Sequence, residues 1–310
     1  MEIRRWGVVF LKLSIAVGLF TWLLKSERLD LSLLTKAPFN ALHLLGMAVL
    51  LGSMVIQVIR WKWFLEAHGI NLSFRDAARL SWISGFFSLF LPGAAGGDIV
   101  RGYYIFRITD NSRLQGISTI FADRLIGIFS LLCIGGLSSV AFLITRNSDR
   151  RLPIGKMALT NILLLTGATA LLICLRFAKS WDIMNAISLG RFGRLWKETT
   201  GVYHGGLLAK SLLISMAGNI LDTLSYVIAS YAIETPISLT QAFIAGPLVT
   251  MANILPLAPG GAGLGEATAS VLFLQLGTES GALIMLLTRI WSAVLRFPGA
   301  LFYIAATAIK

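Results

Sequence analysis

Acidic and basic residues lie beside two glycine-rich turns in an otherwise apolar sequence. Asp98 and Arg101 follow a Pro-Gly pair in the stretch LFLPGAAGGDIVRGY (89–103), and Glu266 follows another in LPLAPGGAGLGEATA (255–269). Where a helix breaks, its free N–H groups attract anions, and an arginine fork matches the oxygens of a phosphate. These residue types and their spacing therefore indicate recognition of an anionic group, and phosphate is the natural ligand.

Further charged residues lie inside longer apolar stretches, where a charge costs at least about 2.5–3.5 kcal/mol and is a functional candidate by default. They are Asp123 and Arg124 near the start of 116–145, Asp222 within 207–233, and Arg289 and Arg296 within 281–309. Arg289 and Arg296 share one helix face because they are seven residues apart. Asp123 with Arg124 also fits a structural pair at the membrane interface, and that alternative stays open.

Asp222 belongs to a polar stripe on its own helix. Asn219, Asp222 and Tyr226 follow the i, i+3, i+7 spacing that places side chains on one helix face. Asp222 fits three roles, namely a counter-ion for Arg289, a proton carrier, or a pair that only stabilises the helix bundle.

Small residues shape both turns. The turn residues are Pro92, Gly93, Gly96 and Gly97 in the first stretch, and Pro259, Gly260, Gly261 and Gly263 in the second. Glycine lets a backbone approach a ligand closely and adopt positive φ. The same spacing contains GxxxG patterns, so close helix packing without a ligand is the alternative.

The composition defines a membrane protein. Hydrophobic residues make up 56% of the chain and charged residues only 14%, whereas a soluble domain usually has about 25% charged residues. The net charge of +12 then favours anionic lipid headgroups as partners and argues against nucleic acid. Cys133 and Cys174 lie far apart in apolar runs and the histidines are scattered, so we expect no metal and no cofactor. The sequence also contains no Walker A motif for ATP hydrolysis.

Apolar runs long enough to cross about 30 Å of hydrocarbon predict six full spans. They lie near 6–24, 41–59, 116–145, 157–175, 207–233 and 281–309. We interpret the first as a retained span, because it contains Lys12 and lacks a small-residue cleavage site. The runs 80–91 and 239–256 are short or broken by proline, and each ends in a Gly/Pro turn. They predict re-entrant helical hairpins, with full spans as the open alternative.

The two turns also predict an internal repeat. Asp98 precedes Arg124 by 26 residues, and Glu266 precedes Arg289 by 23 residues. Each half then consists of two spans, a broken hairpin and a span that carries arginine. An odd number of crossings per half inverts the second copy, as in secondary transporters. We therefore predict an all-α, inverted-repeat bundle in a single membrane domain, 1–310, whose first repeat is 1–155 and whose second is 156–310.

Positive charge predicts the orientation. Most Lys and Arg residues fall on the side that receives both termini and the mouth of the first hairpin, which makes that side cytoplasmic. The stretch 233–281 contains no Lys or Arg, so the second hairpin opens outward. The segment 176–206 alternates basic and apolar residues and predicts an amphipathic helix on the cytoplasmic leaflet, with a polar loop as the alternative.

Four motifs in order carry a family resemblance. The series PGAAGGDIVRG, ADRLIG (122–127), LPLAPGGAGLGEA and TRIW (288–291) resembles the transmembrane flippase region of bacterial lysylphosphatidylglycerol synthases, the multiple peptide resistance factors, and their stand-alone relatives. The resemblance implies lipid translocation in a bacterial cytoplasmic (inner) membrane. It also implies a role for the matching positions, which are Asp98, Arg101, Asp123, Arg124, Glu266 and Arg289. The synthases continue into a soluble aminoacyl-transfer domain, whereas this sequence ends at Lys310, so lysyl transfer is not implied and the substrate stays open.

We therefore expect a lipid flippase that moves an anionic or polyprenyl-linked lipid through a polar cavity at the membrane midplane, and not an enzyme. A membrane-embedded lipid-modifying enzyme is the first alternative. It has little support, because the glycine that would open a GxSG loop before Ser84 is missing. A structural partner of a lipid-synthesis enzyme is the second alternative.

Overall fold

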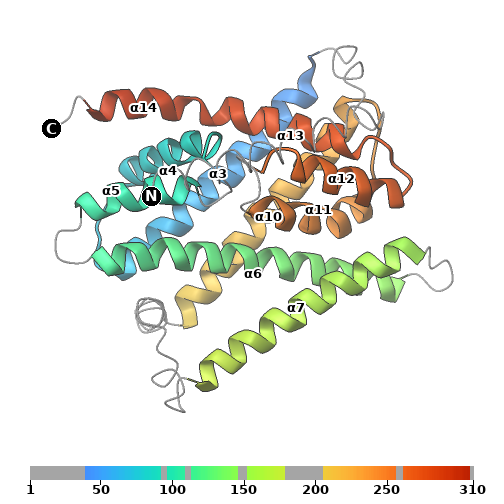
Figure 1. The fold of residues 1–310 in the computed structure, drawn as a ribbon, viewed down its shortest axis with the longest axis horizontal. Coiled ribbons are helices and arrows are strands. Elements are labelled where there is room, and N and C mark those ends of the chain that lie inside the picture. Colours follow the sequence, from blue (N-terminus) through green and yellow to red (C-terminus); the bar gives the residue numbers. More distant parts are fainter. Residues whose placement is uncertain are drawn as a thin grey trace, which may run out of the picture.

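The computed structural model describes residues 39–91, 96–108, 113–145, 152–178, 205–255 and 261–307, and every regular element within these ranges is a helix. The helices are α3 (Ala41–Ala67), α4 (Phe74–Ser88), α5 (Gly96–Ile108), α6 (Arg113–Thr145), α7 (Leu152–Ala178), α10 (Gly205–Ala232), α11 (Leu239–Ile254), α12 (Leu264–Gln275), α13 (Gly281–Arg296) and α14 (Pro298–Thr307) (Figure 1).

Five stretches of the described residues are long and apolar enough to cross a membrane. They are Ala41–Ala67, Leu114–Thr145, Ile154–Leu172, Gly205–Ala232 and Gly281–Ile304. Each overlaps a span predicted from the sequence, which confirms an all-helical, multi-pass membrane protein over these ranges. The predicted span at 6–24 lies outside the described residues, and so does most of the predicted amphipathic helix at 176–206.

The last predicted span consists of two helices. α13 ends at Arg296 and α14 begins at Pro298, with Phe297 between them. Proline has no N–H to donate and is well tolerated in the first turn of a helix, so a new helix starts at this residue. α14 then packs against α4, where a side chain at Gly299 would meet the carbonyl oxygen of Trp82.

α10 occupies the centre of the bundle and contacts α3, α6, α11 and α13. Its buried face carries small residues, among them Ser211, Ser215 and Gly218. In lipid, the hydrophobic effect does not drive helices together, and small side chains allow the close packing that does. Large apolar residues such as Leu213, which is 69% exposed, lie on the outside of the bundle. An outward apolar surface is what a lipid environment requires.

Two pairs of short helices lie at opposite ends of the bundle, α4 with α5 and α11 with α12 (Figure 1). These helices contain 12 to 16 residues. At about 1.5 Å per residue each is shorter than the roughly 30 Å of membrane hydrocarbon. A serine caps the first helix of each pair, since Ser73 accepts from the Asp76 N–H and Ser238 from the Gln241 N–H. The bends at 92–95 and 256–260 lie outside the described residues.

Candidate functional site

A carboxylate at the start of α5 binds an arginine of α6. Asp98 lies in the first turn of α5, where the helix dipole favours a negative charge. Arg124 Nε donates to Asp98 Oδ2 at 2.6 Å, and Arg124 Nη2 donates to Asp98 Oδ1 at 3.0 Å. This two-pronged geometry is the strong form of the arginine–carboxylate pair. The Arg124 side chain is 41% exposed, so one face of the pair stays open.

An equivalent pair joins α12 and α13. Glu266 lies in the first turn of α12, and both of its carboxylate oxygens accept from Arg289, from Nε at 2.5 Å and from Nη2 at 3.1 Å. The second oxygen also accepts from the Gly263 N–H at 2.9 Å, which caps the helix. Arg289 Nη2 further donates to Asn253 Oδ1 and to the Gly261 carbonyl oxygen. The Glu266 side chain is only 2% exposed, so this pair is more deeply buried than the first.

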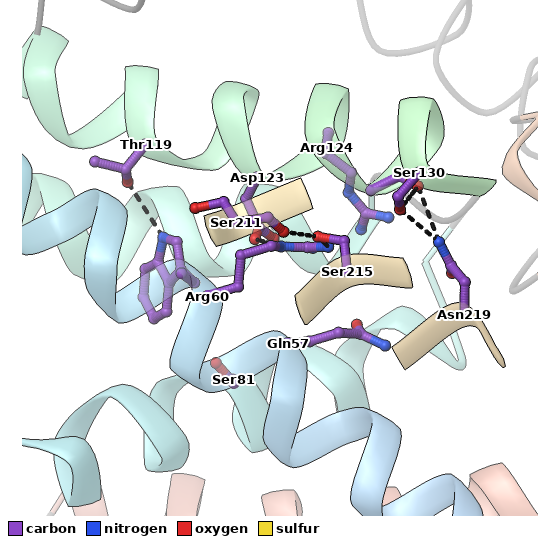
Figure 2. Close-up of polar contacts among 12 residues, drawn as sticks. Gln57, Arg60, Ser81, Thr119, Asp123, Arg124, Ser130, Ser211, Ser215 and Asn219 are labelled. Atoms are coloured by element: carbon purple, nitrogen blue, oxygen red, sulfur yellow. Dashed lines mark hydrogen bonds and ion pairs between the residues drawn. The ribbon is translucent and has the colours of Figure 1, made fainter. Parts of the chain in front are cut away.

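A second cluster in the first half contains two arginines and one acid. Asp123 of α6 accepts from Arg60 Nε of α3 at 2.6 Å and from Arg101 Nη1 of α5 at 3.4 Å. Arg60 also donates to the Ser215 hydroxyl of α10 at 2.8 Å, so it bridges three helices (Figure 2). The Arg101 guanidinium lies over the Trp61 ring, 4.3 Å from its centroid. One carboxylate between two guanidinium groups leaves an excess positive charge here.

A cavity of about 370 Å³ lies between these clusters. It is lined by α3, α4, α5, α6, α10, α11 and α13, and thus by both helices of the first short pair and by α11 of the second. Its charged lining residues are Arg60, Asp98, Arg101, Asp123, Arg124, Asp222, Arg289 and Arg296. Glu266 does not line the cavity itself but accepts hydrogen bonds from Arg289, which does. A volume of this size falls within the range of small-molecule sites and suits a headgroup better than a whole lipid.

Two charged groups of the cavity lack an opposite charge within ion-pair distance among the described residues. Asp222 of α10 forms no ion pair in these ranges and has the Ser53 hydroxyl as a hydrogen-bonding neighbour. Arg296 of α13 donates to the Ser88 hydroxyl at 3.3 Å. The counter-ion of Arg289 is therefore Glu266, not Asp222, which decides one of the alternatives left open by the sequence.

The neighbours of Asp222 on the polar stripe connect α10 to two other helices. Asn219 donates to the Ser130 hydroxyl of α6 at 2.7 Å (Figure 2). The Tyr226 hydroxyl lies 3.2 Å from the Thr250 hydroxyl of α11. Asp222 thus lies between a contact to the first half and a contact to the second.

Glycine permits close helix contact just before each acid. A Cβ atom on Gly97 would lie 2.6 Å from the Ser84 carbonyl oxygen, and the Ser84 hydroxyl donates to the Gly97 carbonyl oxygen at 2.6 Å. A Cβ atom on Gly265 would lie 2.2 Å from Asn253 Oδ1. Gly261 and Gly263 adopt positive φ, at 74° and 81°. The other predicted turn residues, Pro92, Gly93, Pro259 and Gly260, lie outside the described residues.

Sequence reasoning missed two polar members of the site. Arg60 belongs to the Lys and Arg residues whose distribution predicts the orientation of the chain, yet it is 6% exposed and binds Asp123. Asn253 has no distinctive local pattern, although it bonds Arg289. Within the described ranges, no cluster of three or more His, Cys, Asp or Glu side chains has the arrangement of a metal site.

The fold and the cavity define a multi-pass helical membrane protein with charged groups in its interior. The chain matches the family described as the lysylphosphatidylglycerol synthase TM region over residues 9–298, and it belongs to that family. It is also 24% identical over 302 residues to a UPF0104 membrane protein of Pyrococcus horikoshii, in a match that covers 89% of this chain and 88% of that protein. The resemblance drawn from the four motifs is thereby confirmed.

Proposed function

We propose that this protein moves an anionic lipid between the leaflets of a cell membrane, with the lipid headgroup in the charged cavity and its tails in the bilayer. The observation that carries the proposal is the cavity itself, which is lined by five arginines and by helices of both short pairs, namely α4, α5 and α11. A phosphate headgroup fits this lining, because a guanidinium group binds phosphate through two parallel hydrogen bonds.

The balance of charge around the cavity favours an anion. Five arginines and three aspartates line it, and Glu266 behind Arg289 brings the acids to four. One positive charge is therefore in excess. The acids hold most guanidinium groups in fixed orientations, and a headgroup phosphate then meets donors that need no rearrangement. Such preorganisation lowers the cost of binding.

The two halves support an inverted repeat, with residues 1–155 as one copy and 156–310 as the other. In each half, an acid in the first turn of a short helix binds an arginine of the next helix. In each half, the glycine before that acid packs against the preceding helix. The placement of the short-helix pairs at opposite ends of the bundle fits two re-entrant hairpins that open toward opposite sides (Figure 1).

The proposed topology has six spans and both termini in the cytoplasm of a bacterial cell. This orientation follows the distribution of Lys and Arg, which predicts a cytoplasmic side for the α3–α4 and α5–α6 connections, residues 68–73 and 109–112. Hairpins that enter from opposite leaflets give the headgroup a polar route from either side. The same arrangement occurs in secondary transporters, whose sites lie where two broken segments meet.

Reconstitution into vesicles tests the proposal. Purified protein is placed in phosphatidylcholine vesicles that contain a trace of fluorescent phosphatidylglycerol, and a membrane-impermeant quencher reports how much label reaches the outer leaflet. We expect faster exposure of the inner label than in protein-free vesicles. Loss of one charged contact to the headgroup is worth about 1.5–3 kcal/mol, so Arg289→Ala should slow movement by about tenfold or more.

Two further variants serve as comparisons, and thermal unfolding of each variant shows whether a slower rate reflects lost folding. Arg289→Lys retains the charge but loses the fork, and it should lie between the native chain and Arg289→Ala. Leu213→Ala changes an exposed apolar side chain and should leave the rate unchanged. Mass spectrometry of the vesicle lipids identifies chemical change, which would favour the enzyme alternative. Unchanged movement in Arg289→Ala would reject the assigned site.

A further inference from the structure

Asp222 differs from every other acid of the cavity. Asp98, Asp123 and Glu266 each accept hydrogen bonds from at least one arginine. Asp222 lines the same cavity but forms no ion pair with any described residue. An ionised carboxylate away from water is costly unless it is paired, and protonation removes that cost. Asp222 is therefore the acid of this cavity best suited to exchange a proton.

Arg296 is the cationic counterpart. Arg60, Arg101, Arg124 and Arg289 each contact a carboxylate, whereas Arg296 contacts the Ser88 hydroxyl at the end of α4. Asp222 and Arg296 line the same cavity, so an ionised Asp222 attracts the Arg296 guanidinium across it. The two groups form no ion pair with each other.

The groups that share the cavity with Asp222 come from every helix packed against α10. The charged groups on these helices are Arg60 of α3, Asp123 and Arg124 of α6, and Arg289 and Arg296 of α13, while α11 contributes the uncharged Thr250 and Asn253. Tyr226, one turn along α10, is the remaining titratable neighbour. Among the described acids that line the cavity, Asp222 alone has no arginine partner, so a proton that enters the cavity meets one carboxylate that is not held by a guanidinium group.

We propose that Asp222 binds a proton as the lipid headgroup binds Arg296, and that this coupling lets a proton gradient drive lipid movement. The inference rests on the transport function proposed above. When Asp222 is ionised, it attracts the Arg296 guanidinium and competes with the headgroup phosphate for it. When Asp222 is protonated, Arg296 is available to the phosphate. Proton and lipid then increase each other's affinity by the same factor, as linkage requires.

The proton has a defined path in this cycle. It passes from water on one side of the membrane to a carboxylate oxygen of Asp222, and the same O–H bond later breaks to return the proton to water on the other side. For one proton per lipid, a pH difference of one unit sustains up to about a tenfold difference in lipid between the leaflets.

The test uses the full chain in vesicles with fluorescent phosphatidylglycerol and a pH difference of about one unit. The native chain should accumulate label in one leaflet, and reversal of the gradient should reverse the accumulation. Asp222→Asn mimics the protonated acid, so it should equilibrate label at equal pH but show no accumulation under the gradient. Asp222→Glu should restore the response. Glu279→Gln, which neutralises an exposed acid outside the cavity, is the matched control and should behave as the native chain does.

The outcomes distinguish the two proposals. The coupling would be overturned if lipid movement in the native chain did not respond to the pH gradient, or if Asp222→Asn still responded to it. Either result would leave the transport function standing. No movement under any condition would overturn the transport function.

Infrared difference spectra recorded during a pH titration give a readout that does not depend on transport. The native chain should show the C=O stretch of a titrating carboxylic acid that Asp222→Asn lacks. Identical spectra for the two chains would overturn the assignment of Asp222 as the proton-binding group.

Discussion

The two acid–arginine pairs should differ in their contribution to stability, although they occupy equivalent places in the two halves. The Glu266–Arg289 pair has side-chain exposures of 2% and 21%, whereas the Asp98–Arg124 pair has 16% and 41%. Removing one partner of a buried pair leaves an uncompensated charge and costs about 3–5 kcal/mol. An exposed pair is screened by solvent and contributes about 1 kcal/mol or less.

Glu266→Gln should therefore destabilise the protein by about 3 kcal/mol and Asp98→Asn by about 1 kcal/mol. At about 2–4 °C per kcal/mol, the first variant should unfold roughly 6–12 °C below the native chain. The assay is thermal unfolding of the purified variants in one detergent. The double variant Glu266→Gln with Arg289→Gln should recover about 1–3 kcal/mol relative to the sum of the single changes. Equal losses for the two acids, or additive losses in the double variant, would refute the reasoning.

Three further predictions test the packing and the topology. Gly265→Ala and Gly97→Ala should each destabilise the protein by about 1–3 kcal/mol in the same unfolding assay, whereas Gly155→Ala, which meets no atom within 4 Å, should not. Asn161→Leu removes hydrogen bonds from α7 to the Ser139 hydroxyl and to the Ile244 carbonyl oxygen, and should cost about 1–3 kcal/mol on thermal unfolding. Single cysteines introduced at positions 150 and 195 of a cysteine-free chain should react with an impermeant reagent from opposite sides of the membrane.

Hydropathy and the positions of Gly and Pro predicted the parts of this fold that depend on local sequence. The apolar runs placed the described spans, and the Gly/Pro turns located the breaks after α4 and α11. The recurrence of an acid before an arginine also identified residues that the structure brings into contact, Asp98 with Arg124 and Glu266 with Arg289. These features succeed because a bilayer fixes helix length and a broken helix requires particular residues.

Partners across helices could not be predicted in the same way. Arg60 and Asp123 are 63 positions apart, and their contact depends on how α3 and α6 are rotated about their axes. Hydropathy gives the length of a span but does not give its rotation, which small residues and interhelical hydrogen bonds decide. For the same reason, the sequence left three roles open for Asp222, and only the placement of Glu266 against Arg289 removed one of them.

The unequal exposure of the two pairs bears on how a repeat of this kind would work. In an inverted repeat, each half can adopt the conformation of the other, and alternating access exchanges the two. Arg124 is more exposed than Arg289, so under the proposed inverted repeat the first half would be the more open one. An exchange of roles would bury the Asp98–Arg124 pair and expose the Glu266–Arg289 pair. Asp222 and Arg296 line the cavity and have no ion-pair partner among the described residues, so we expect their contacts to be the ones that differ most between two such states.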